Sequence, residues 1–308
     1  MVEPNEVGCT EIKKLFSQLD LGKYNLLNIP IEEFDSEQKF DIVIAEGFLQ
    51  VISNWQTIFK KLKSLAGRGG ILVITCEDEI GRFVERVKRF IAHIATKEIK
   101  DYDEKLERMI EIFSPQLETL TGRSRPIKDW IEDEILFEDY NRRTLTIKKA
   151  IELIGDEWDI LGCSSPSFFV DYSWYKDVNS DYKNDFCRQY EKKSYNLLLA
   201  GRGEIDAEEN MVRQIRGYIE KVQELDILYE KSEGNNSDYI KQAVACLKRI
   251  AESVSDFDNE LLIFLQDAIQ ILEADSCRID FSIYPNFNKA FGRSAQYLSF
   301  VKNSLCKG

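Results

Sequence analysis

The stretch Phe40-Asp41-Ile42-Val43-Ile44-Ala45, followed by Glu46-Gly47, decides the fold. Its nearly continuous apolar run predicts a β-strand that is covered on both faces, as strands of parallel sheets are. A helical apolar stripe follows at 55–65, then glycines at 67, 69 and 70 that are expected to end it, and a second apolar run at 71–75. Strands that alternate with amphipathic helices in this way indicate βαβ units and a parallel sheet.

Towards the N-terminus the same alternation continues. Met1-Val2 predicts the tail of a strand, residues 6–19 predict a helix and residues 26–29 a short strand. Towards the C-terminus, residues 78 to about 155 are expected to be mostly helical.

Two final strands are predicted at 158–161 and 195–200, and the turn Gly201-Arg202-Gly203 is the best candidate boundary. Beyond it the apolar residues follow only the helical period. We therefore expect an α/β domain over 1–204, with a helical insert at about 78–155, and an all-helical region over 205–308. That region is expected to pack as a bundle against the core or against a second copy of the chain.

Composition limits the partners and the location. The formal net charge of -13 argues against a nucleic-acid duplex as substrate, because binding one requires many neutralising cations. No apolar run approaches the ~20 residues of a membrane span. The first ten residues have no secretory pattern, and the seven cysteines are scattered without a C-x-x-C pair. A cytoplasmic protein with reduced thiols and no metal site is expected.

Glu3 is the first candidate binding residue. In a dinucleotide-type fold, the acid that follows the second strand accepts hydrogen bonds from the ribose hydroxyls of the cofactor. Val2-Glu3-Pro4-Asn5 leads from a strand tail into a helix, as this arrangement requires. Alternatively, Glu3 only stabilises the helix N-terminus, which favours an acid in any case.

These motifs resemble those of class I S-adenosylmethionine-dependent methyltransferases. Residues 40–49 and 69–75 look like the fourth and fifth strands of that family, and residues 2–5 like its second strand with the ribose-binding acid. Residues 28–32 fall where the third strand of the family ends. The resemblance covers roughly residues 1–204 and implies a Rossmann-like methyltransferase sheet that binds S-adenosyl-L-methionine.

By this resemblance, each candidate residue has an implied role toward the cofactor. Glu3 would hold the ribose, Ile29 and Pro30 would flank the adenine, and Ala45 and Glu46 would lie near the methionine end. The first strand of the family and its glycine-rich turn have no counterpart in the chain. We therefore expect a sheet that lacks its first strand, in a chain that is incomplete at its N-terminus and inactive alone.

Two further segments resemble bacterial methyltransferases with a helical insert before the sixth strand. They contain Arg125 and Trp130, and then Tyr172, Trp174 and Tyr175. An aromatic and basic lining suits a sugar-like or anionic small acceptor, since rings stack on apolar faces and Arg binds oxyanions. The alternative is that these aromatic residues only pack in the core or in a lid.

No catalytic residue is assigned from the sequence. The one histidine, His93, is expected to be a hydrogen-bonded helix residue, and Glu46, Glu77 and Asp78 follow strand ends, where either catalytic groups or helix caps occur. The aromatic residues near the C-terminus are expected in the core of the helical bundle.

Two other functions stay open. One is a non-catalytic interaction protein built on a degenerate methyltransferase core. The other is a nicotinamide-dependent oxidoreductase, which the strand spacing after residue 40 disfavours.

Overall fold

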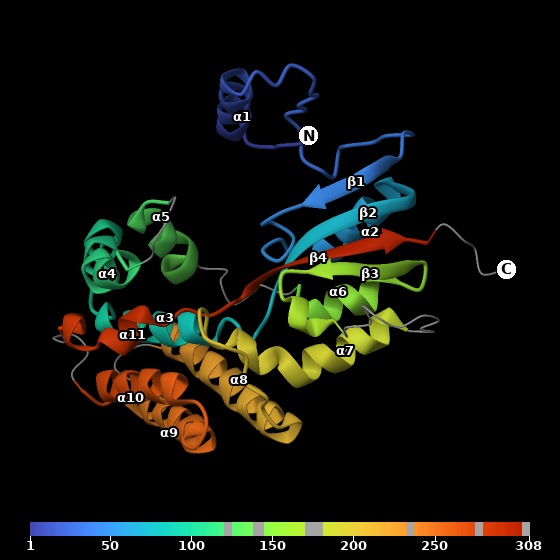
Figure 1. Ribbon diagram of the computed structural model, residues 1–308. Helices are drawn as coiled ribbons and strands as arrows, with labels where there is room; N and C mark the ends of the chain where they lie inside the picture. Colours follow the sequence, from blue (N-terminus) through green and yellow to red (C-terminus); the bar gives the residue numbers. More distant parts are fainter. Residues whose placement is uncertain (120–124, 138–144, 170–180, 233–236, 275–279, 304–308) are drawn as a thin grey trace.

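The computed structural model describes residues 1–119, 125–137, 145–169, 181–232, 237–274 and 280–303 (Figure 1). The strands are β1 (Phe40–Ala45), β2 (Ala66–Glu77), β3 (Trp158–Cys163) and β4 (Ala295–Lys302). The α-helices are α1 (Glu6–Gln18), α2 (Trp55–Leu65), α3 (Phe83–Ala95), α4 (Tyr102–Leu117), α5 (Ile127–Ile131), α6 (Ile147–Ile154), α7 (Tyr182–Lys193), α8 (Glu209–Lys231), α9 (Ser237–Val254), α10 (Asn259–Glu273) and α11 (Pro285–Lys289). A π-helical turn spans Glu132–Leu136, and 3₁₀ turns span Pro166–Phe168, Ser194–Leu197 and Phe281–Ile283.

The four strands form one mixed sheet in the order β1-β2-β4-β3. Strands β1 and β2 are parallel, whereas β4 is antiparallel to both β2 and β3. It follows that β1, β2 and β3 all point the same way, and that the last strand of the chain lies between β2 and β3. The predicted α/β class, with a Rossmann-like sheet and an additional helical region, is confirmed.

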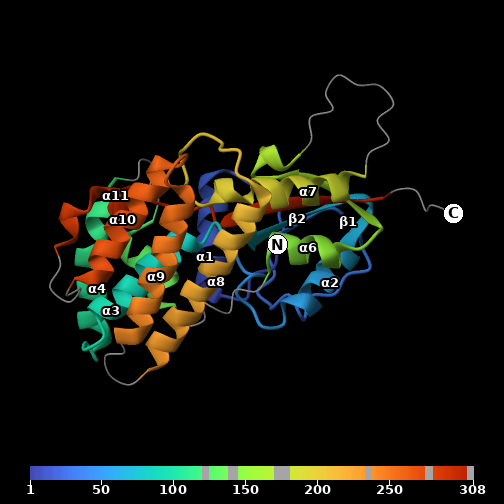
Figure 2. The same ribbon diagram turned by 90° about the horizontal axis from the view of Figure 1, so that it is seen from below.

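One face of this sheet is covered by helices. Helices α2 and α6 lie on the same side of the sheet, and α7 lies beyond β3, which it contacts (Figures 1 and 2). Their apolar side chains bury the inward residues of all four strands, including Val43, Leu72, Phe300 and Trp158. Trp158 and Phe300 are fully buried, so this cluster is the core of the sheet half of the molecule.

The opposite face of β1 is open to solvent. Ile42 is 56% exposed and Ile44 is 64% exposed, while Val43 and Ala45 between and beside them are buried. Among the described residues, β1 pairs only with β2, so it forms an edge of the sheet. An edge strand with exposed β-branched side chains is unusual in a soluble fold, because it offers unpaired backbone groups and apolar surface together.

The segment before β1 forms a small unit of its own beyond that edge (Figure 1). Val2 pairs with Leu27 in a parallel bridge, through Glu3 N–Leu27 O and Leu27 N–Met1 O hydrogen bonds of 3.0 Å. The predicted strands at residues 1–2 and 26–29 are thus reduced to one bridge. The predicted helix follows as α1, with Asn5 as its N-cap.

The second half of the molecule is helical and is organised around α3. Every residue of α3 is buried, including five ionisable ones. Helices α4, α8 and α10 contribute to the same apolar cluster, which also contains Phe281 and Phe287. No helix in the described part of the chain is both long and apolar enough to cross a membrane.

The structure corrects two strand predictions. Residues 195–200 are no strand; Ser194–Leu197 is a 3₁₀ turn, in which Tyr195 and Leu197 are buried, as is Leu198 directly after it. In a short run of apolar residues, the hydrophobic periodicity cannot distinguish a buried strand from a buried turn. Conversely, the region predicted to be all helical ends in β4, and Phe300 lies in the sheet core. The predicted domain boundary at residue 204 stays a prediction. Strand β4 does not fit it, because β4 lies after the boundary but pairs with strands before it.

The glycines at 67, 69 and 70 also differ from expectation. They lie inside β2, which begins directly after α2, and do not separate the helix from the strand. Gly69 has a φ of 69°, and the pairing with β1 is irregular between Phe40 and Ile42. A left-handed residue inside a strand marks a local bulge, for which glycine is suited.

Candidate functional site

The candidate site lies at the edge of the sheet where the parallel strands end. Strand β1 ends at Ala45 and β2 ends at Glu77, and parallel strands bring their carboxyl ends to one edge. In open α/β sheets ligands bind in the crevice outside this edge. Tyr297 of the antiparallel β4 pairs with Thr75, so the beginning of β4 lies at the same edge.

The turn after β1 is held against β2. Gly47 has a φ of 78°, a left-handed conformation that favours glycine, and its N–H donates to Thr75 Oγ1 at 2.6 Å. Thr75 Oγ1 donates in turn to Gln50 Oε1 at 3.4 Å. Ala45 is only 1% exposed, so its methyl group is buried beneath this edge of the sheet.

Glu46 is the exposed carboxylate of this turn. Its Oε1 accepts a hydrogen bond from the hydroxyl of Tyr297. That contact is the main reason why the pKa of Tyr297 lies above its ordinary value. Sequence reasoning missed Tyr297 as a partner, because residue 297 was expected in a helical bundle 250 residues away from the β1 turn.

Glu3 is positioned by the bridge between Val2 and Leu27. Its Oε1 accepts the N–H of Asn5 at 2.8 Å, and its backbone carbonyl accepts the side-chain amide of Asn28 at 2.9 Å. The N-cap of α1 is Asn5, whose Oδ1 accepts the N–H of Val7. Asn5 is therefore the N-cap, and Glu3 accepts the N–H of this cap residue, a contact that fits the alternative in which Glu3 stabilises the start of α1. Its other carboxylate oxygen keeps acceptor capacity.

Gly8 leaves room for this carboxylate. A Cβ atom at Gly8 would stand 3.1 Å from Cδ of Glu3. Ile29 and Pro30 follow the bridge directly and are half-buried. The structure therefore brings Glu3 next to the backbone just before Ile29 and Pro30, while Ala45 and Glu46 lie at the end of β1.

The two acids at the end of β2, Glu77 and Asp78, have buried partners. Glu77 forms an ion pair with Arg82 at 3.0 Å. Asp78 is fully buried and accepts the N–H groups of Ile80 and Gly81 and the hydroxyl of Tyr190. Burial raises the pKa of Asp78, and these hydrogen bonds oppose the rise. Both acids thus hold the turn between β2 and α3, but neither caps α3, whose N-cap is Arg82 without a side-chain cap.

The predicted acceptor residues are only partly within the described residues. Tyr172, Trp174 and Tyr175 lie outside them. Arg125 is exposed and pairs with Asp133. Trp130 packs edge-on against Phe113, at 5.6 Å between ring centroids, beside the helical core. A role for Arg125 and Trp130 in binding an acceptor stays a prediction.

His93 is a buried residue of α3 whose Nδ1 lies 2.8 Å from Oδ1 of Asp226 on α8. The expectation of a hydrogen-bonded helix residue fits this contact. Among the described residues, no group of three or more His, Cys, Asp and Glu side chains is placed to hold a metal ion.

Comparison with known proteins gives a limited result. No protein-family model and no curated protein matches the chain. The structure of PKMT2 from Rickettsia typhi in complex with AdoHcy is similar with a TM-score of 0.38 and 14% identity, over 95% of this chain and 66% of that one. The structure of PKMT2 from Rickettsia typhi is similar with a TM-score of 0.39 and 15% identity, over 94% and 65% of the two chains. The chain thus spans slightly less than two thirds of their length, and the fold assignment rests on the strand order.

Proposed function

We propose that this chain is part of an S-adenosylmethionine-dependent methyltransferase that acts on a small or glycan-like acceptor. The observation that carries the proposal is the strand order β1-β2-β4-β3 with an antiparallel β4. A plain dinucleotide-binding sheet has its fourth, fifth and sixth strands side by side. An antiparallel last strand between the fifth and the sixth is the arrangement of the class I methyltransferases that the sequence motifs resemble. The same order disfavours a nicotinamide-dependent oxidoreductase.

In this proposal the cofactor residues keep the roles that the resemblance implies. Glu3 accepts the ribose hydroxyls, which its remaining carboxylate oxygen supports. Ile29 and Pro30 flank the adenine, and Ala45 and Glu46 border the methionine end. These residues fit the adenosine part of the cofactor.

A glycine-rich turn for the remaining part is not among the residues of the chain. In the order of a dinucleotide-binding sheet, the first strand lies between the second and the fourth. Here that place lies between the bridged Val2 and the open edge of β1, where Ile42 and Ile44 are exposed. We propose that a strand and glycine turn from outside these 308 residues fill this place, and that the chain is inactive without them.

The chemistry demands alignment more than proton transfer. Methyl transfer from a sulfonium is an in-line displacement, in which positioning supplies much of the acceleration. A general base is needed only if the acceptor keeps its proton at neutral pH. In this proposal Glu46, the exposed carboxylate directly after β1, would border the transferred methyl group, and its hydrogen bond from Tyr297 would orient it.

Calorimetry with S-adenosylmethionine tests the proposal. The chain extended through the reading frame upstream of Met1 is compared with the chain of 308 residues. We expect micromolar binding to the extended chain only. Glu3→Gln should weaken it about tenfold, the size of one charge-assisted hydrogen bond. Glu6→Gln, an exposed acid in the first turn of α1, is the matched control and should change little.

The outcome also separates the two classes of function. If the extended chain folds and binds no S-adenosylmethionine, the methyltransferase proposal fails. The non-catalytic interaction protein is then the better explanation of the exposed β1 face.

A further inference from the structure

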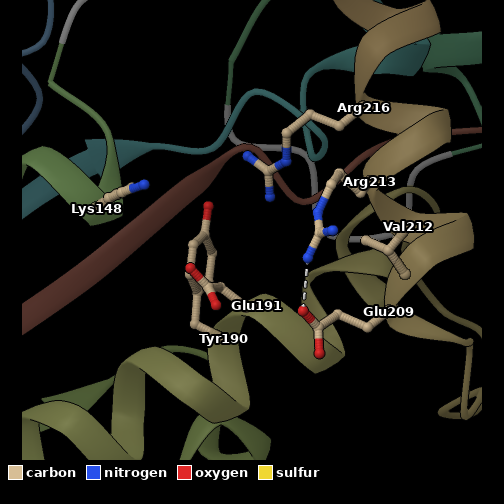
Figure 3. A pocket seen from close by; sticks show the side chains of 7 residues that line it. All are labelled: Lys148, Tyr190, Glu191, Glu209, Val212, Arg213 and Arg216. Carbon is tan, nitrogen blue, oxygen red and sulfur yellow. Dashed lines mark hydrogen bonds and ion pairs between the residues drawn. The ribbon is translucent and has the colours of Figure 1, made fainter.

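A pocket of about 210 Å³ lies between α6, α7 and α8, close to the carboxyl edge of the sheet (Figure 3). It has room for several water molecules and thus for a group of phosphate size. Its connection to the edge is Tyr190, which lines the pocket and donates its hydroxyl to Asp78, the residue directly after β2.

The cations of this pocket differ in their partners. Arg213 pairs with Glu209 one turn away, at 2.8 Å, and points toward it (Figure 3). Lys148 and Arg216 line the same pocket, and neither forms an ion pair with any carboxylate among the described residues. In a protein with a net charge of -13, two cations in one pocket that form no direct ion pair are unusual.

Arg216 makes its direct contacts with neutral groups, while the charges of Asp78 and Glu79 nearby favour its protonated form and raise its pKa. Its guanidinium lies 6.0 Å from the ring centroid of Tyr190 and donates to Ser194 Oγ at 3.4 Å. Tyr190 remains a neutral phenol, since burial raises its pKa well above the ordinary value. A guanidinium has five N–H donors. The hydroxyls of Ser194 and Tyr190 use at most two, so donors are left for a ligand.

We propose that this pocket binds an oxyanion, the carboxylate or phosphate group of a small molecule, between the Arg216 guanidinium and the Lys148 ammonium. Arginine offers the planar pair of donors that such groups accept, and lysine adds a point charge. Glu191 also lines the pocket and lowers its affinity for anions. If the proposed methyl transfer holds, the site is placed to take an acidic group of the acceptor; the binding itself does not depend on that function.

The test is a calorimetric titration of the chain of 308 residues with sodium phosphate and, separately, with sodium acetate. Chloride keeps the ionic strength constant, because screening alone changes the affinity for anions. We expect saturable binding to one site by at least one of them, and the tighter ligand identifies the source of the oxyanion. No cofactor is present, so the result is independent of whether the chain binds S-adenosylmethionine.

Variants assign the binding to the pocket. Arg216→Gln and Lys148→Met should each weaken it about tenfold, as the loss of a charge-assisted hydrogen bond does. Lys148 is exposed, so its variant stays informative if Arg216→Gln disturbs the fold. Glu191→Gln should strengthen binding. Arg213→Gln, the paired cation on the same helix, is the control and should leave it within about twofold.

Two results would overturn the proposal. One is that neither anion binds to the wild-type chain. The other is that Arg213→Gln weakens binding as much as Lys148→Met and Arg216→Gln do, which would indicate unspecific attraction to a cationic surface.

Discussion

Lys88 should make the stability of this protein rise with pH above neutrality. The residue is fully buried in α3, where its ammonium donates to the carbonyl of Ala290 and lies 4.5 Å from the ring centroid of Phe291. Burial lowers the pKa of Lys88 from 10.5 to about 7, although the nearby Glu85 opposes the change. The difference corresponds to about 5 kcal/mol between the protonated and the neutral folded state.

The direction of the pH dependence of stability follows from the number of protons that the folded and the unfolded chain bind. Between about pH 7 and 10.5 the unfolded chain keeps a proton on Lys88 that the folded chain has lost. Unfolding therefore takes up a proton, and raising the pH opposes it, by about 1.4 kcal/mol per pH unit within this range. From pH ~7.5 to ~9.5 the contribution of Lys88 to the free energy of unfolding should grow by about 2 to 3 kcal/mol.

Urea unfolding, followed by circular dichroism at several pH values, measures this contribution as the difference between wild type and Lys88→Met. Burial raises the pKa of Glu85, and without its cation Glu85 would destabilise the variant further as the pH rises. The double variant Glu85→Gln/Lys88→Met removes that effect. Lys248→Met, at an exposed lysine paired with Glu273, is the control and should show no slope. A difference that stays flat with pH for Lys88→Met would refute the reasoning, because Lys88 would then keep its proton in the folded state.

Three further predictions concern the sheet and α8. Glu46→Gln should lower the pKa of Tyr297 toward its ordinary value, since the carboxylate is the main cause of its rise; an ultraviolet absorbance titration measures it. Gly217→Ala should stabilise the fold by about 0.4–1 kcal/mol in thermal unfolding, because no atom beyond the backbone of α8 itself and the two adjacent residues lies within 4 Å of the added Cβ and α8 gains helix propensity. Phe300→Ala should cost about 3–5 kcal/mol in urea unfolding and Val301→Ala, half-buried on the opposite face of β4, only about 1 kcal/mol. Equal effects at the two positions would contradict the placement of β4 in the sheet core.

The sequence predicted those helices and strands whose pattern of apolar residues is contained within the element itself. The strand at 40–45 and the helix at 55–65 appear with the predicted bounds, because an apolar run and a 3.6-residue stripe are each complete in themselves. Strand β4 was not predicted, because the strands with which it pairs are far from it in the sequence. Ile71 pairs with Val301 across 230 residues, and no local feature of residues 295–302 announces that pairing.

The residues of the candidate sites likewise fall into those that local sequence patterns predicted and those that they did not. Glu3 and Glu46 were found because each follows a strand whose end the sequence marks. The oxyanion pocket was not found, since Lys148, Tyr190 and Arg216 come from three helices. Only the packing of α6, α7 and α8 brings them together, and no spacing in the sequence encodes it.

The position of β4 changes how the helical region relates to the site. Because β3 precedes α8 and β4 follows α11, the helices from α8 to α11 are an excursion between two strands of one sheet. The chain returns through residues 290–294, where the N–H of Gly292 donates to Glu85 of α3 at 2.9 Å and the carbonyl of Ser294 accepts the N–H of Asp78 at 2.9 Å. The carboxyl edge is therefore built jointly by the sheet and the helical region. A change that loosens α3 should disturb the edge as directly as a change in β1 or β2, which makes the helices part of the framework of the site.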